Sequence, residues 1–130
     1  MADTTMHVEL VSPERKLFSG DATIVIARPD GGDAAFLPGH APFLGLLGVG
    51  PVIIKTADGK EIKAAIHGGF IEVRNNNVTI LSDVAELSTE IDVARAQEAK
   101  ARVEGSAHGL SDVERAAALR RANTRLAVTS

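Results

Sequence analysis

Residues 34–54 read AAFLPGHAPFLGLLGVGPVII and form the longest apolar segment of the chain. About 18 apolar residues in a row are enough for a membrane-spanning helix, but this run contains three prolines and four glycines. Each proline removes a backbone donor and costs about 3 kcal/mol inside a helix. The segment therefore predicts short strands joined by tight corners, packed in the middle of a β-sandwich core. The expected strands are Ala34–Leu37, Phe43–Leu47 and Val52–Thr56.

Alternation of apolar and polar residues continues on both sides of this segment, from Met6 to about Leu87. Asp58-Gly59 is typical of a tight hairpin turn, residues 75–77 are all Asn and tolerate the left-handed region, and Gly68-Gly69 allows a corner or bulge. Turn signals at such short spacing favour a sandwich or barrel. The further expected strands are Met6–Val11, Thr23–Ala27, Glu61–Ile66, Phe70–Arg74 and Val78–Leu81.

The pattern changes at about Ser88, where strand formers give way to Ala, Glu, Arg and Gln, which favour helix. Thr89 or Asp92 can cap a first helix that ends before Gly105, and residues 111–114 are a capping box for a second. Two helices of about 13 to 16 residues joined by a short loop predict an antiparallel hairpin. The apolar stripe expected on the second helix is Val113, Ala116, Leu119, Ala122 and Leu126.

These patterns predict an α+β chain with two parts, a β-sandwich at residues 1–87 and a helical hairpin at residues 88–130. The mating surface of the hairpin is mostly alanine, so it buries little apolar area and should be only marginally stable by itself. We expect the hairpin to dock on the sandwich or on a partner, and to exchange one for the other.

Composition argues against several classes of function. The formal net charge is −3 and the chain has no Trp, Tyr or Cys, which disfavours a nucleic-acid surface, a disulfide framework and a thiolate metal site. The histidines lack the spacing of metal ligands. Neither a phosphate loop nor a nucleophile with an adjacent base is present. We expect neither a metal site nor a catalytic site.

Three features remain as candidate contacts. His40 lies in a rigid Pro-Gly-His-Ala-Pro corner, where we favour a ring that hydrogen-bonds nearby backbone, or a contact residue, over a catalytic one. Arg121 and Arg125 form a twin-guanidinium face suited to phosphate or carboxylate, although a solvated surface is the simpler interpretation. The first helix carries a face of alternating charge, typical of solvated salt bridges, made of Asp92, Arg95, Glu98 and Arg102.

Six segments in order carry a resemblance: LPGHAP at 37–42, GPV at 50–52, GGFIEV at 68–73, VTIL at 78–81, IDVARA at 91–96 and LRRANTRL at 119–126. Each is weak alone, but together they cover nearly the whole chain and resemble the ATP synthase epsilon subunit family. The resemblance implies a ten-stranded β-sandwich followed by a two-helix hairpin.

The resemblance also implies a function. The chain would be a non-catalytic subunit in the central stalk of the proton-translocating F-type ATP synthase, at the cytoplasmic face of the membrane and not inserted in it. Its sandwich would bind the gamma subunit and the ring of c subunits. Its hairpin would lie folded on the sandwich or extend toward the alpha/beta catalytic head, where it restrains ATP hydrolysis.

Two sets of site residues are implied in the same way, with no permanent cofactor. In the set for subunit contacts, acidic Asp30 and Asp33 stand where the family tends to carry Glu, and the neighbouring Ala34-Ala35 departs from a more usual Leu-Gly. A regulatory, weakly bound ATP would be held by Ile91, Asp92, Arg95, Ala96, Arg121 and Arg125. The contacts with gamma and the c-ring would be made by Asp30, Gly31, Asp33, Gly39 and His40.

Two other classes of protein remain open from the residues alone. One is a free-standing β-sandwich ligand-binding module with a helical dimerisation tail. The other is a nucleotide-hydrolysing enzyme, against which the missing phosphate loop and the missing paired base argue.

Overall fold

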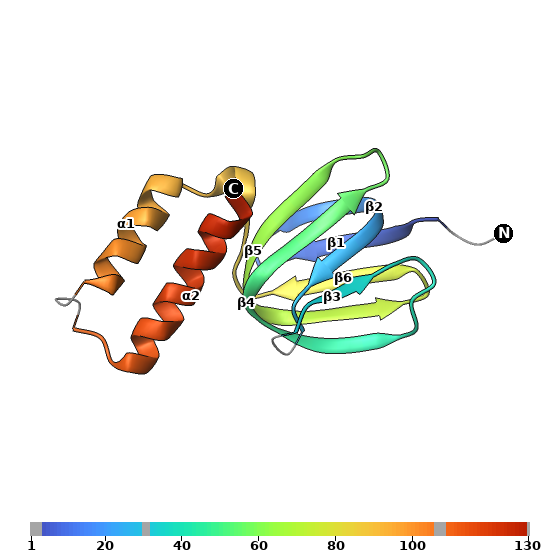
Figure 1. Ribbon diagram of the computed structural model, residues 1–130. Helices are drawn as coiled ribbons and strands as arrows, with labels where there is room; N and C mark the ends of the chain where they lie inside the picture. The colour runs from blue at the N-terminus through green and yellow to red at the C-terminus, as the bar shows by residue number, and fades with distance from the viewer. Residues whose placement is uncertain (1–3, 30–31, 106–108, 130) are drawn as a thin grey trace.

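The computed structural model describes residues 4–29, 32–105 and 109–129. A β-sandwich is followed by a pair of helices, as the sequence predicts (Figure 1). No helix in these ranges is both long and apolar enough to cross a membrane. The strands are β1 (Met6–Val11), β2 (Lys16–Ala27), β3 (Ala34–Phe36), β4 (Phe43–Thr56), β5 (Glu61–Arg74), β6 (Asn77–Ser82) and β7 (Ala85–Leu87). The helices are the 3-10 turn η1 (Ser88–Glu90), α1 (Val93–Glu104) and α2 (Asp112–Thr129).

The sheet closes on itself. Its order runs β1–β6–β5–β4–β2, and β2 pairs again with β1. The β1–β6 pair is parallel and the other pairs are antiparallel, with β3 beside β2 and β7 beside β5. Closure removes most of the free edges through which strands of other chains could pair. The largest fully buried side chains fill its interior and include Phe36, Met6, Leu10, Ile54, Ile66, Ile71 and Ile80.

The described residues form seven continuous strands, whereas ten were expected. The difference lies in β2, β4 and β5, which are long and bend so that each serves both layers of the sandwich. In β5, residues 69–74 pair with β6 and residues 64–66 pair with β7. The corners expected at residues 48–51 and 68–69 are bends within strands, because the β4–β5 ladder continues from Phe43 opposite Val73 to Lys55 opposite Glu61.

Backbone conformation at a few residues makes these bends and turns possible. Gly68 and Gly69 have φ of +91° and +139°, which side-chain-bearing residues rarely adopt. Asn75 and Asn76, with φ of 50° and 59°, turn the chain from β5 into β6, as their left-handed tolerance predicts.

Both helices of the hairpin begin at residues that the sequence singles out. Asp92 caps α1 by accepting the N–H of Arg95 at 3.0 Å, and Ser111 Oγ accepts the N–H of Glu114 at 3.2 Å. Arg115 then ties the two helices together, since its guanidinium donates to the carbonyl oxygens of Val103 at 3.1 Å and Glu104 at 3.3 Å. These bonds satisfy carbonyls that the end of α1 leaves without intrahelical partners.

α2 lies between α1 and the sandwich, where it packs on β4 and β5 (Figure 1). The apolar stripe expected on α2 is therefore only partly right. Val113 is 79% exposed and Ala116 is exposed, whereas the buried residues are Ala122, Thr124 and Val128. The reason is tertiary: the C-terminal half of α2 meets the sandwich, and its first turn lies beyond the sheet.

Candidate functional site

A cleft of about 380 Å³ opens between η1, the inner face of α1 and the end of α2. Its volume lies in the range of small-molecule sites. Of the six residues expected to hold nucleotide, Arg121 does not line the cleft; it lies one turn before Arg125 and is exposed. The cleft is lined by Glu86, Glu90, Ile91, Asp92, Arg95, Ala96, Ala99, Arg102 and Arg125.

Helical spacing places the α1 residues on one wall. Positions 92, 95, 99 and 102 recur every three or four residues, and position 96 follows 92 by four, so these side chains share a face. The hydrogen bond that Asp92 accepts from the backbone of Arg95 fixes where the helix begins. Ala96 and Ala99 have small side chains and leave space in the middle of this wall. This wall therefore presents two cationic side chains, Arg95 and Arg102, separated by a small apolar surface.

The acidic side chains of the cleft are already engaged. Glu90 accepts from Arg15 at 2.7 Å, and this bond lowers the pKa of the Glu90 carboxyl. Glu86 accepts from Arg125 Nε at 2.7 Å and from His67 Nε2 at 3.0 Å. By contrast, within the described ranges no ion pair involves Arg95 or Arg102. Arginines without a carboxylate partner make the cleft suited to an anion.

Four of the lining residues do not belong to the site predicted from the sequence. Arg102 was recognised only as part of a charged stripe, although its spacing of seven residues from Arg95 was a usable signal. Ala99, between them, follows from the same spacing. Glu86 and Glu90 lie before the helix, and no local periodicity connects them with it. Pairing of β7 with β5 brings Glu86 to the cleft, opposite Ala65.

The second predicted set lies elsewhere, and its members Asp30 and Gly31 fall outside the described residues. Asp33 and Gly39 lie beyond opposite ends of β3, and Asp33 is paired with Arg28 at 2.6 Å. Gly39 has φ of +84° and donates its N–H to Asn76 Oδ1 at 2.6 Å. His40 Nδ1 donates to the Ala41 carbonyl at 2.7 Å, and its ring lies 5.0 Å from that of Phe36. The expected bond from this ring to nearby backbone is confirmed.

A row of exposed apolar side chains, not predicted from the sequence, crosses the outer face of the sheet. Leu46 lies opposite Phe70 in the β4–β5 register, and Phe70 lies opposite Leu81 in the β5–β6 register. Their exposed fractions are 67%, 41% and 39%, and Leu44 on the same face of β4 is 69% exposed. We call these four residues the apolar row. Beside it, an open groove of about 720 Å³ is bordered by residues 11–13 and 81–83.

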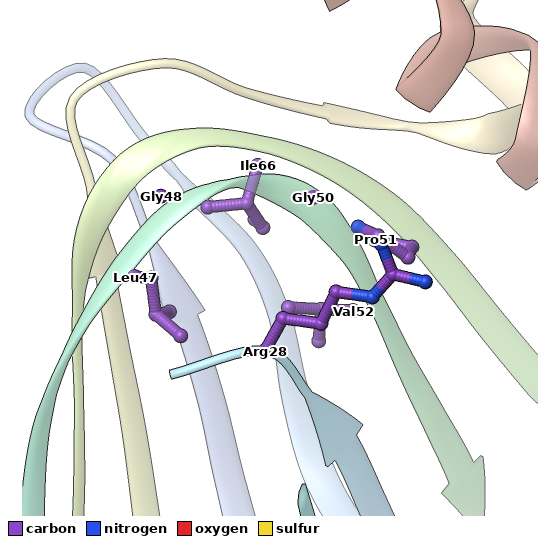
Figure 2. A pocket seen from close by; sticks show the side chains of 7 residues that line it. All are labelled: Arg28, Leu47, Gly48, Gly50, Pro51, Val52 and Ile66. Carbon is purple, nitrogen blue, oxygen red and sulfur yellow. The ribbon is translucent and has the colours of Figure 1, made fainter. Parts of the chain in front are cut away.

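The remaining structure offers neither a second enclosed ligand cavity of useful size near β4 nor a metal site among the described residues. A cavity of about 10 Å³ lies under Arg28 at the bend of β4, among Leu47, Gly50 and Val52 (Figure 2). That volume fits at most one water molecule. In the described part of the chain, no group of three or more His, Cys, Asp or Glu side chains is placed to hold a metal ion.

Residues 5–88 match the family model of the ATP synthase delta/epsilon chain β-sandwich domain. The ATP synthase epsilon chain of Streptomyces avermitilis is 45% identical over 127 residues, which are 96% of this chain and 95% of the relative. That of Streptomyces coelicolor is 50% identical over 105 residues, 79% of this chain and 85% of the relative. This chain therefore belongs to the ATP synthase epsilon chain family.

Solved structures agree on the fold. A chain of the Euglena gracilis mitochondrial ATP synthase (OSCP/F1/c-ring) aligns with a TM-score of 0.80 and 21% identity, covering 100% of this chain and 84% of that one. A chain of the Tetrahymena thermophila mitochondrial ATP synthase (central stalk/c-ring) aligns with a TM-score of 0.64 and 17% identity, covering both chains completely. At these identities the likeness supports the fold alone.

Proposed function

We propose that this chain is a non-catalytic rotor subunit of the F-type ATP synthase. Its sandwich attaches to the gamma subunit and the c-ring in the central stalk, peripheral to the cytoplasmic face of the membrane. Its hairpin restrains ATP hydrolysis when it extends toward the alpha/beta catalytic head. Membership of the epsilon chain family favours this function over a free-standing ligand-binding module.

The apolar row is the observation that carries the attachment. Exposed apolar side chains scattered singly are normal, but a contiguous apolar patch on a soluble protein marks an interaction site. Here the register places three of them side by side on neighbouring strands. We assign this face to the gamma subunit, and Asp33 with the corner at Gly39 and His40 to the contact with the c-ring.

Replacing Leu46 with Asp tests the attachment. We expect Leu46→Asp to keep the thermal unfolding of the wild type, since this side chain is mostly solvated, and to lose co-elution with purified gamma subunit. Val113→Asp is the matched control, because Val113 is exposed but lies at the start of α2. His40→Ala should weaken attachment only modestly. Wild-type binding of gamma by Leu46→Asp would contradict the assignment of the row.

We also propose that the cleft binds the polyphosphate of ATP and thereby favours the hairpin folded on the sandwich. Cationic side chains of both α1 and α2 line it, so one anion bound there would bridge the two helices. Hydrogen bonds to charged groups contribute about 1.5–3 kcal/mol each. A shift from 1:99 to 99:1 needs about 5.5 kcal/mol, so two or three phosphate contacts are sufficient for a partial shift.

Titration calorimetry tests the cleft. We expect the isolated protein to show heat of ATP binding at millimolar nucleotide, and replacement of both Arg121 and Arg125 with Ala to abolish it. Arg120→Ala, an exposed arginine of the same helix, should keep the binding. A chain ending at Leu87 should never show it. The absence of heat from the wild type would leave these arginines only an inhibitory role.

A further inference from the structure

Three side chains from three elements meet where α2 docks on the sandwich. His67 from β5 and Arg125 from α2 both donate to the same oxygen, Oε1 of Glu86 on β7, at 3.0 Å and 2.7 Å. The His67 side chain is only 6% exposed, whereas Glu86 and Arg125 are 30% exposed and line the cleft. The buried imidazole therefore lies behind the carboxylate, on its sandwich side.

The charge state of His67 follows from its neighbours. Burial lowers the pKa of His67, and the positive charges of Arg125 and Arg121 on α2 lower it further, while Glu86 on β7 opposes them. The imidazole is thus neutral near pH 7. Because a carboxylate can only accept, Nε2 carries the proton. In the described part of the chain Nδ1 has no hydrogen-bond partner, so Glu86 is the group that this ring serves.

The bond to Glu86 restricts the guanidinium of Arg125. A guanidinium is planar with five donors in a fixed fork, so holding Nε fixes the directions of the two terminal nitrogens. Glu86 accepts at Nε, which leaves the terminal nitrogens for the cleft that Arg125 lines. The carboxylate in turn is held by a strand of the closed sheet rather than by the hairpin.

We propose that His67 is a positioning residue for the cleft: through Glu86 it fixes the guanidinium of Arg125 toward the polyphosphate of a nucleotide. This inference rests on the proposed binding of nucleotide in the cleft. It makes a sandwich residue part of a site whose lining arginines all lie on the hairpin. Anion affinity therefore depends on a hydrogen bond within the sandwich as well as on the charges of the helices.

The first test is calorimetry of the full chain with inorganic tripolyphosphate and with ATP. His67→Gln keeps an amide donor within reach of Glu86, and we expect it to bind within about twofold of the wild type. Leucine has no donor and the side chain of asparagine is too short to reach Glu86. His67→Leu and His67→Asn should therefore bind both anions about tenfold more weakly. In an Arg125→Ala background, His67→Leu should have no further effect. Helical circular dichroism checks that the hairpin stays folded in each variant.

The second test needs no ligand. The Nε–H signal of Arg125 in nitrogen-edited NMR should exchange slowly with water in the wild type and in His67→Gln, and rapidly in His67→Leu and His67→Asn. Slow exchange without any heat of binding would support the positioning and refute the nucleotide proposal. Equal anion binding by all variants, no rescue by Gln over Leu, or an Arg125 signal insensitive to residue 67 would overturn the positioning.

Discussion

Single residues set how close the strands approach at the bend of the sheet. A Cβ at Gly69 would overlap the backbone of β6 at Leu81 and Ser82, and its φ of +139° suits glycine alone. Gly48, at the bend of β4, has neither restriction, since no atom lies within 4 Å of an added Cβ and its φ is not positive. Two glycines at the bends of neighbouring strands thus have different physical roles.

Gly69→Ala should destabilise the sandwich by about 2 kcal/mol or more, because backbone strain and a clash with backbone atoms both add to the free energy. Thermal unfolding measures this as a fall in Tm of several degrees. Gly48→Ala is the matched control and should unfold at the wild-type temperature or slightly above it. A wild-type Tm for Gly69→Ala would mean that the strand relaxes around the new methyl group.

Among the elements, α2 connects the two parts of the molecule. It meets α1 and the sandwich at once, with small buried residues such as Ala122 and Thr124. Such residues bury little area, at about 25 cal/mol per Å², so the polar contact of Arg125 with Glu86 is a substantial part of the docking surface. His67 brings a titratable group directly behind this contact.

Docking of the hairpin should depend on pH. Docked, the pKa of His67 lies below the ordinary value of 6.5; undocked, the imidazole is solvated and binds a proton more readily. Stability of the docked form is therefore complete above about pH 6.5 and declines as the pH falls below it. Spin labels on Gln97→Cys and Lys55→Cys, both exposed positions, should show a broader distance distribution at pH 5.5 than at pH 7.5.

The natural chain contains no cysteine, so the labels report only this distance. His67→Gln in the same labelled protein is the control and should give the same distribution at both pH values, because an amide does not titrate. An unchanged distance distribution in the protein that retains His67 would contradict the predicted pH dependence of docking. Equal broadening in the His67→Gln variant would assign it to other groups.

At the scale of the whole molecule, the sandwich is complete without the hairpin. The ring of strands closes between β1 and β2, and the last strand ends at Leu87. The hydrophobic cluster of the interior draws its buried members from residues 6–80, all before the helices. The helical part is joined to it by the packing of α2 on β4 and β5 and by contacts such as Arg15 with Glu90 and Arg125 with Glu86.

A chain that ends after Leu87 should fold by itself. We expect a cooperative unfolding transition with β-type circular dichroism, unchanged binding to gamma through the apolar row, and loss of any restraint on ATP hydrolysis. The full chain measured beside it is the reference for all three properties. An unfolded truncated chain, or inhibition that persists without the helices, would contradict the division of roles between the two parts.

Features that depend on neighbours along the chain could be predicted from the sequence. The Asn turn, the Asp92 cap and the Ser111 cap are short-range interactions, and the structure contains each of them. Alternating and helical periodicity separated the sandwich from the hairpin for the same reason. The family resemblance, carried by short segments spread over the chain, supplied the expected function.

Features that depend on contacts between distant residues could not be predicted in this way, because they arise when the chain folds. Pairing between strands keeps β4 and β5 continuous at residues that the sequence indicates as strand ends. Docking of α2 buried Thr124 and Val128 and left Val113 exposed. His67 and Arg125 meet at Glu86 although they lie 19 and 39 residues from it in sequence. No local pattern encodes such a meeting, because it arises from pairing and packing across the whole fold.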